Sequence, residues 1–318
     1  MDCHSHNFTV EGALIPGDRR KIGGADIAAL LGLSPWAKPS DVWLRIVKGE
    51  GASVAGIAED GLDLEPGIFS LIRRRRPAEY IEHPTLEHPT FKGGVGHLDL
   101  LDKAGGCVVD AKAIHWRARD KWSDGQGGRI VPEHVRLQLD WYMVCAGAES
   151  AQIGAFFGLG EFEMIPVAPL DFDTRGQILE VAQKFWVDHI ETGIPPPPDG
   201  GAGYGVILGE RLAQLPETPV CLPPEADAVV AEYLAARSGI SALTKRKELA
   251  AQQLEAMLVE AGSRLGLAGG ARIKKTTGQS RSTNWEALAM SFEPSTEEIE
   301  RFSVLKNRPL LTVNEVKK

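Results

Sequence analysis

The chain has 318 residues, a formal net charge of −8, 43% hydrophobic residues and 25% charged residues. This composition is typical of a globular protein of about two domains. The net charge argues against a surface coated throughout with basic side chains for nucleic acid, although a local basic patch still binds phosphate. No apolar run approaches the roughly 20 residues that cross a bilayer. The start MDCHSHNFTV lacks a signal-peptide pattern, so we expect a cytoplasmic protein without a membrane partner.

The first two thirds of the chain predict alternating helices and strands. The expected elements, in order, are two helices in 22–49 around a turn at Leu33-Ser34-Pro35, a helix at 59–76 that ends in the basic run Arg73–Arg76, strands at 80–82 and 95–112, a helix at 132–146, strand structure at 151–167 and a helix at 177–193. This order predicts a mixed α/β core, with a mixed central sheet flanked by helices.

The last third predicts a separate helical part. A Pro/Gly-rich break at 194–205 indicates a domain edge, so we expect a first domain at 1–200, a linker at 201–224 and a helical coiled segment with a small α+β tail at 225–318. Apart from Lys247, the heptad a and d positions of this segment are apolar: Tyr233, Ala236, Ile240, Leu243, Ala250, Leu254 and Met257. The pattern is compatible with a helical hairpin, a short coiled coil or packing onto its own domain.

The four cysteines are widely scattered. Cys3, Cys107, Cys145 and Cys221 form no Cys-x-x-Cys pair, so the sequence indicates neither a disulfide framework nor a zinc knuckle. We expect free thiols.

The stretch GHLDLLDKAGGCVVDAK predicts a β-hairpin with charges inside its strands. Because side chains alternate between the faces of a strand, Asp99, Asp110 and Lys112 share one face. A two-residue loop at Ala104-Gly105 would put Asp99 opposite Asp110, whereas a loop at Gly105-Gly106 would put it opposite Lys112. Either register brings the two carboxylates to roughly 5 to 8 Å from each other.

Two carboxylates this close repel each other unless a cation lies between them or one stays protonated. Mg²⁺ would relieve the repulsion, because it prefers one or two carboxylates together with waters and phosphate oxygens. The alternative is a cross-strand salt bridge from Asp99 to Lys112 on a solvated face.

Two further fragments complete a recognisable order of residues. GLDLEP places Glu65 in the helix before the sheet, and QLDWY places Gln138 and Tyr142 one helical turn apart. With these residues the chain resembles the YqaJ-type viral recombinases, which are relatives of the phage lambda exonuclease in the RecB-like branch of the PD-(D/E)XK nuclease superfamily. The matching stretches span about residues 20–200 and are IGGADIAALLGLSPW, GLDLEP, GHLDLL, DAK, QLDWYMVCAG and FWVDHIETGIPPPPDG.

The resemblance implies a restriction-endonuclease-like core and metal-dependent hydrolysis of DNA. Glu65, Asp99 and Asp110 match the acidic metal ligands, with the backbone carbonyl of Ala111 as a neighbouring ligand. Lys112 matches the catalytic lysine. Gln138 matches the glutamine that supports substrate and water, whereas Tyr142 is expected to pack. Asp110 stands where glutamate is common, and both residue types bind Mg²⁺.

The stretch IGGADIAAL resembles the family's 5′-phosphate motif. Two glycines before a helix expose backbone N–H groups that suit a terminal phosphate. Gly23, Gly24 and Ala25 match this motif, with Arg19 or Arg20 as its arginine, but Ala25 replaces a serine and removes one hydrogen bond to the phosphate. The alternative is that the glycines permit close helix packing.

The resemblance therefore predicts a Mg²⁺-dependent exonuclease, with Mn²⁺ able to substitute. It would digest linear double-stranded DNA from 5′ to 3′ and leave 3′ single-stranded tails for phage-type recombination. The expected partners are DNA ends, a single-strand annealing protein and further copies of the chain, as in a trimeric ring, in a bacterial cytoplasm. Two alternatives remain: an iron–sulfur RecB-like nuclease, and a catalytically silent DNA-binding or assembly module on a nuclease fold.

Overall fold

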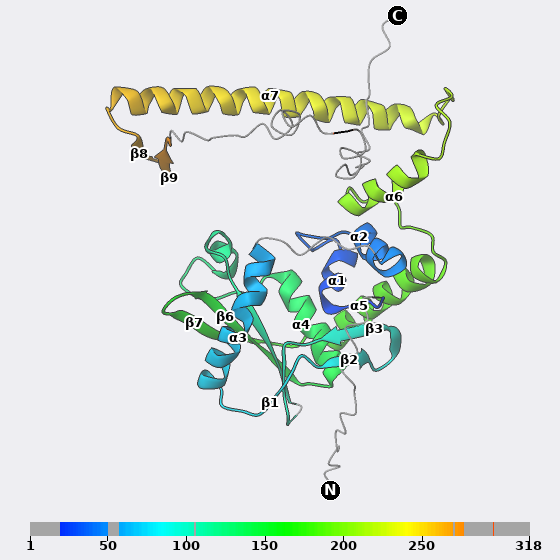
Figure 1. Ribbon diagram of the computed structural model, residues 1–318, viewed down its shortest axis with the longest axis vertical. Coiled ribbons are helices and arrows are strands. Elements are labelled where there is room, and N and C mark those ends of the chain that lie inside the picture. Colours follow the sequence, from blue (N-terminus) through cyan, green and yellow to red (C-terminus); the bar gives the residue numbers. More distant parts are fainter. Residues whose placement is uncertain (1–19, 50–56, 105, 270, 277–294, 296–318) are drawn as a thin grey trace, which may run out of the picture. The chain divides into compact units, whose positions relative to one another are not determined.

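The computed structural model describes residues 20–49, 57–104, 106–269, 271–276 and 295 (Figure 1). The chain divides into two compact units, Met1–Ala213 and Gln214–Lys318. No helix in the described ranges is both long enough and apolar enough to cross a bilayer.

The first unit begins with the expected helices. They are α1 (Gly24–Leu30), α2 (Pro39–Trp43), which continues in a π-helical turn at Leu44–Lys48, and α3 (Ile57–Arg75). Pro39 occupies the first turn of α2, where its missing N–H costs nothing. Arg73, Arg74 and Arg75 form the last turn of α3, as the sequence predicts.

A five-stranded mixed sheet forms the centre of this unit, in the order β1-β4-β5-β6-β7. The strands are β1 (Tyr80–Glu82), β4 (Leu100–Asp102), β5 (Cys107–Ala113), β6 (Ser150–Gly158) and β7 (Glu161–Val167). Only the β5–β6 pair is parallel, and α4 (Glu133–Ala146) lies in the connection between these two strands. A crossover of this kind is what a parallel pair requires.

Helices cover both faces of the sheet (Figure 1). Side chains of α3, such as Ile72, form one apolar cluster with the odd-numbered residues of β5, such as Val109. The larger cluster includes Val108 of β5 and Leu139 and Met143 of α4. The mixed α/β core with a central sheet flanked by helices is therefore confirmed. The face of β5 that contains Asp110 is the face turned toward the larger cluster.

The first strand of the hairpin expected within 95–112 is interrupted at residues 98 and 99, which corrects the prediction of a continuous strand before the turn, whereas the second strand forms as β5. β2 (Thr85–His88) and β3 (Phe91–His97) pair with each other in a separate two-stranded sheet, and the chain bends at Asp99 before β4. The cause is tertiary packing, because an added Cβ at Gly94 would lie 2.8 Å from Cζ2 of Trp141 and one at Gly96 would lie 3.0 Å from Cβ of Cys145. These glycines let β3 lie directly against α4.

The end of the first unit contains a helix that the sequence did not predict. After α5 (Phe172–Phe185) and a π-helical turn at Trp186–Glu191, helix α6 (Ala202–Leu212) occupies the first half of the expected linker. The N–H of Gly203 donates to Oδ1 of Asp41 at 2.8 Å, and the Asp199 carboxylate accepts from Ser40. These contacts fix the start of α6 on α2. Residues 213–224 contain no helix or strand.

The second unit consists of α7 (Glu225–Glu260) and the hairpin of β8 (Leu265–Ala268) and β9 (Ala271–Lys274). The helical segment expected to begin at residue 225 is α7. Among the described residues of this helix only Leu258 is buried. An added Cβ at Gly266 of β8 would lie 2.9 Å from Cδ2 of Leu258, so the hairpin packs on the end of the helix. Apart from residue 295, the part of the expected α+β tail that follows residue 276 lies outside the described residues.

The cysteines in the described ranges are free thiols, as expected. Cys107 is buried, Cys145 is partly buried and Cys221 is exposed. Cys3 lies outside the described residues.

Candidate active site

Asp110 is a buried carboxylate in the middle of β5. Its side chain is 1% exposed, and its Oδ2 lies 2.9 Å from Nζ of Lys112, two residues along the same strand. Its Oδ1 has no hydrogen-bond partner among the described residues. The pairing of Lys112 with Asp110, together with this burial, contradicts the alternative of an Asp99–Lys112 bridge on a solvated face. A buried carboxylate with a free oxygen is costly unless a cation or another group satisfies it.

Asp99 reaches the same place from the bend before β4. Its Oδ2 accepts a hydrogen bond from the N–H of Ala111 at 2.7 Å. Leu100 pairs with Val109, so the register extended by one residue puts Asp99 opposite Asp110. This is the register that the Ala104-Gly105 loop predicts. The prediction that Asp99 lies inside a strand is wrong, because the chain leaves β3 and changes sheets there.

The charges of Asp99, Asp110 and Lys112 act on one another. Burial, and then the charge of Asp110, raise the pKa of Asp99 to about 8. Burial opposes the charged form of Lys112, but the carboxylates of Asp110 and Asp99 outweigh it and raise the lysine pKa above its usual range. The cluster therefore contains an ammonium group whose charged form is favoured and one acid, Asp99, whose ionisation is disfavoured by burial and by the neighbouring Asp110.

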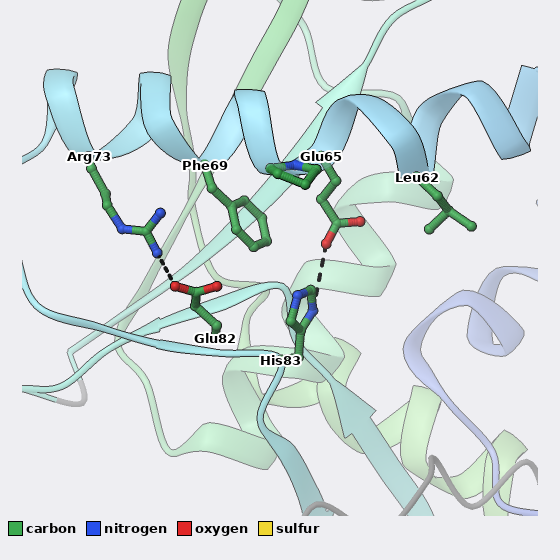
Figure 2. Close-up of a pocket in the computed structure, with 7 residues that line it drawn as sticks. Leu62, Glu65, Phe69, Arg73, Glu82 and His83 are labelled. Atoms are coloured by element: carbon green, nitrogen blue, oxygen red, sulfur yellow. Dashed lines mark hydrogen bonds and ion pairs between the residues drawn. The ribbon is translucent and has the colours of Figure 1, made fainter.

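Glu65 approaches the cluster from α3. Its charge contributes to the raised pKa of Asp99, which places the two carboxylates in one electrostatic neighbourhood. Oε1 of Glu65 lies 3.6 Å from Nδ1 of His83, the residue after β1. Figure 2 shows both side chains in a pocket of about 270 Å³, and the lining residues are Leu62, Glu65, Pro66, Phe69, Arg73, Glu82 and His83.

Gln138 and Tyr142 lie one turn apart on α4, as predicted. Nε2 of Gln138 donates to Oη of Tyr142 at 2.9 Å, so the amide has a fixed orientation. Burial raises the pKa of Tyr142, and the charges of Asp110, Lys112 and Asp99 also act on it, which places the ring beside the cluster. The tyrosine is buried, in agreement with a packing role.

The two glycines of IGGAD have different roles in this structure, because Gly23 donates a backbone hydrogen bond and Gly24 permits close packing. The N–H of Gly23 donates to Oδ2 of Asp26 at 2.6 Å, and Arg45 binds the same oxygen. An added Cβ at Gly24 would lie 2.7 Å from Cε1 of Tyr142 and 2.9 Å from the Gln138 carbonyl oxygen. Gly24 therefore allows α1 to pack directly on the helix that contains Gln138.

The other described members of the expected 5′-phosphate motif are not buried in the packing of α1 on α4. Ala25 and Arg20 are exposed, and Arg19 lies outside the described residues. Contact with a 5′-phosphate stays a prediction for Arg19, Arg20, Gly23, Gly24 and Ala25.

The residues of the cluster fit a hard divalent ion. In the ranges that the structure describes, no three His, Cys, Asp or Glu side chains are grouped so as to hold a metal by themselves. Mg²⁺ does not need three, because one or two carboxylates commonly bind it together with waters and substrate phosphates. Asp110, with its free buried oxygen, and the adjacent Asp99 supply such a pair. Glu65 and the Ala111 carbonyl remain predicted additional ligands.

Two histidines near the cluster escaped the sequence analysis. Burial lowers the pKa of His134, and the charge of Lys112 lowers it further, so this residue lies close to the lysine. Its position four residues before Gln138 was a usable signal, since such residues share a helix face. No sequence pattern marked His83, because its position beside Glu65 depends on the backbone conformation of the folded chain.

The sequence of the chain is similar to that of one curated protein, and its fold is similar to that of solved structures. The chain is 26% identical over 208 residues to the uncharacterized protein YqaJ of Bacillus subtilis (strain 168). The match agrees with the resemblance to YqaJ-type proteins that the sequence motifs indicate. It spans 62% of this chain and 62% of YqaJ, which is less than two thirds of that relative's length. No protein-family model matches the chain.

Two solved structures are similar to the chain in part. An alkaline exonuclease from Laribacter hongkongensis is 15% identical with a TM-score of 0.47, and the match covers 63% of this chain and 97% of that one. A phage related exonuclease from Haemophilus somnus 129PT is 13% identical with a TM-score of 0.40, and the match covers 54% of this chain and 96% of that one.

Proposed function

We propose that the chain is a metal-dependent deoxyribonuclease that hydrolyses phosphodiester bonds at the ends of linear double-stranded DNA. The buried Asp110, with a free carboxylate oxygen beside the Lys112 ammonium, is the observation that supports this function most directly. The likeness to YqaJ and the order of Glu65, Asp99, Asp110, Lys112 and Gln138 along the chain are consistent with it.

Asp99 and Asp110 would hold Mg²⁺, or Mn²⁺ in its place, with Glu65 and the Ala111 carbonyl as further ligands. When bound, the ion supplies a Lewis acid that polarises the phosphate and lowers the pKa of bound water. The N–H of Ala111 holds the Asp99 carboxylate in place, so the ligand does not need to reorganise.

Lys112 and Gln138 act on the substrate side of the cluster. The Lys112 ammonium stays charged because of its acidic neighbours, so it offsets negative charge that develops on the phosphate or orients the attacking water. Tyr142 uses its hydroxyl to hold the Gln138 amide, which leaves the amide oxygen available to position water or a substrate group.

The finer features of the proposed function come from the family resemblance. They are 5′ to 3′ digestion, 3′ single-stranded tails for phage-type homologous recombination, a single-strand annealing protein as partner and a ring-shaped homo-oligomer around DNA. They also include the contact of Arg19 or Arg20, Gly23, Gly24 and Ala25 with a terminal 5′-phosphate.

Digestion of end-labelled DNA tests the proposal. Linear double-stranded DNA labelled at the 5′ or the 3′ end is incubated with and without Mg²⁺, using the natural chain, Lys112→Ala and Lys103→Ala. We expect mononucleotides from the 5′-labelled end only with metal, and a rate at least about 100-fold lower for Lys112→Ala. Lys103 is the matched control, since this half-exposed lysine in the same hairpin pairs with Glu79.

Each contrary result removes a different part of the proposal. First release of the 3′ label would contradict the polarity and leave a nuclease. Metal-independent binding with both labels intact would favour the silent DNA-binding module.

The iron–sulfur alternative has little support in the described residues. That branch needs three clustered cysteines after the helix of Gln138, whereas Cys145 lies within this helix and Cys221 is the one cysteine after it in the sequence. Burial raises the pKa of Cys145 to about 12, which disfavours the thiolate that an iron–sulfur cluster requires. A coloured purified protein would revive this alternative.

A further inference from the structure

His83 has an unusual backbone conformation beside the candidate active site. Its φ of +50° makes it the one non-glycine residue with a positive φ among the described residues. Histidine tolerates this left-handed region better than most residues, but the conformation still costs energy and persists only where its surroundings enforce it. Such positions are concentrated at functional sites.

The backbone of His83 is fixed to Asp99. The N–H of His83 donates to the main-chain oxygen of Asp99 at 2.9 Å, which extends the pairing of β1 with β4 by one residue. The strained residue is thus adjacent to the bend that presents the Asp99 carboxylate to the cluster.

The side chain of His83 points away from this pairing and toward α3 (Figure 2). Its Nδ1 lies 3.6 Å from Oε1 of Glu65, and its ring packs against Phe69 with 5.4 Å between the ring centroids. One residue therefore contacts two candidate metal ligands that come from different elements, Asp99 through its main chain and Glu65 through its ring.

We propose that His83 is a positioning residue that holds the Glu65 carboxylate toward the Asp99–Asp110 pair. The left-handed backbone turns the imidazole toward α3 while the main chain stays bonded to Asp99. The inference rests on the proposed function, because it assigns Glu65 a place in the metal site. Groups that bind and orient a ligating carboxylate typically contribute about 10-fold to 100-fold to metal affinity.

Binding of Mn²⁺ alone to the DNA-free protein, followed by isothermal titration calorimetry, tests this role without relying on activity. His83→Gly keeps the left-handed backbone and removes the ring, whereas His83→Asn keeps a short polar group that also tolerates this conformation. We expect the dissociation constant for Mn²⁺ to rise about 10-fold in His83→Gly and to recover most of that loss in His83→Asn. Glu82→Gln is the matched control, since Glu82 lines the same pocket but pairs with Arg73.

The outcomes separate this inference from the proposed function. If Asp110→Asn abolishes Mn²⁺ binding and His83→Gly binds like the natural chain, His83 does not position Glu65 and the metal site stands. If Asp110→Asn binds Mn²⁺ unchanged, the metal site and the inference both fail. Equal weakening by His83→Gly, His83→Asn and Glu82→Gln would show a general effect on the pocket and would also overturn the inference.

Discussion

The two units place residues in opposite and equally unusual environments. In the first unit, Asp110 is 1% exposed although an ionised carboxylate is expensive to bury. In the second unit, α7 exposes large apolar side chains, with Ile240 66% exposed and Met257 62% exposed. Both arrangements cost stability when considered alone.

The two regions differ in the kind of partner that would remove the cost, which is a cation for the acid cluster and an apolar surface for α7. The acid cluster is a largely buried arrangement that still lacks a balancing positive charge, and a small divalent ion supplies this charge. The a and d positions of α7 form an extended stripe that is apolar apart from Lys247, which only a surface of comparable length would cover. Chemistry is therefore expected in the first unit, and variants of the two units should respond differently.

Asp110→Asn should have the largest effect on activity. The substitution keeps the size of the side chain but removes a charge from the cluster, and we expect the rate of DNA hydrolysis to fall about 1,000-fold, or about 4 kcal/mol of transition-state stabilisation. Circular dichroism checks that the fold is retained, and the digestion of labelled DNA measures the rate. An Asp110→Asn protein with the full rate would exclude this carboxylate as a metal ligand.

Gly24→Ala should have the largest effect on stability. The added methyl group would overlap the Tyr142 ring and the Gln138 carbonyl oxygen, so α1 must move away from α4. We expect a loss of about 1–3 kcal/mol in the free energy of unfolding, measured by urea denaturation. Gly67→Ala in α3 is the control, since its added Cβ meets no atom within 4 Å and should stabilise the helix slightly. An unchanged midpoint for Gly24→Ala would contradict the packing role of this glycine.

The stability of the metal-free protein should depend on Asp99. The folded chain retains a proton on Asp99 up to about pH 8, whereas the unfolded chain releases it near pH 4. The contribution of this group is thus complete below about pH 4 and is lost as the pH rises toward 8. We expect added Mg²⁺ to raise the melting temperature more at pH 9 than at pH 6, because the ion replaces the proton.

Asp99→Asn serves as the control for this pH dependence. The amide has no proton to exchange with the ion, so the difference between pH 6 and pH 9 in the stabilisation by Mg²⁺ should become smaller. A difference that equals that of the natural chain would assign the titration to another group.

Local patterns predicted most of the fold, whereas features that depend on tertiary contact escaped. Helical periodicity located α3, α4 and α7, and the alternation of side chains placed Asp110 and Lys112 on one face of β5. The bend at Asp99 was missed because it follows from the packing of Gly94 and Gly96 against α4. Helix α6 was missed because its start depends on Asp41, 162 residues away from Gly203.

In the candidate site, too, the residues related by local spacing were predictable and those related by tertiary contact were not. Local spacing placed Asp99, Asp110 and Lys112 together, as the structure also does, whereas their catalytic and metal-binding roles and that of Gln138 stay predictions. The contact of His83 with Glu65 was not predictable, because it needs a left-handed residue that only the assembled pocket enforces.

Gly239→Ala should have the smallest effect, and its sign indicates whether the stripe on α7 is covered in solution. Gly239 lies beside Ile240 in the exposed middle of α7, and an added Cβ there meets no atom within 4 Å. A helix that keeps this face free should gain about 0.5–1 kcal/mol from the alanine, visible as slower hydrogen exchange of the α7 amides. Gly262→Ala is the control, since φ is +64° at this position after the helix and alanine should destabilise it. Faster exchange in Gly239→Ala would mean that another surface packs closely on this part of α7. The contrast with the buried acid cluster would then be smaller than the isolated chain suggests.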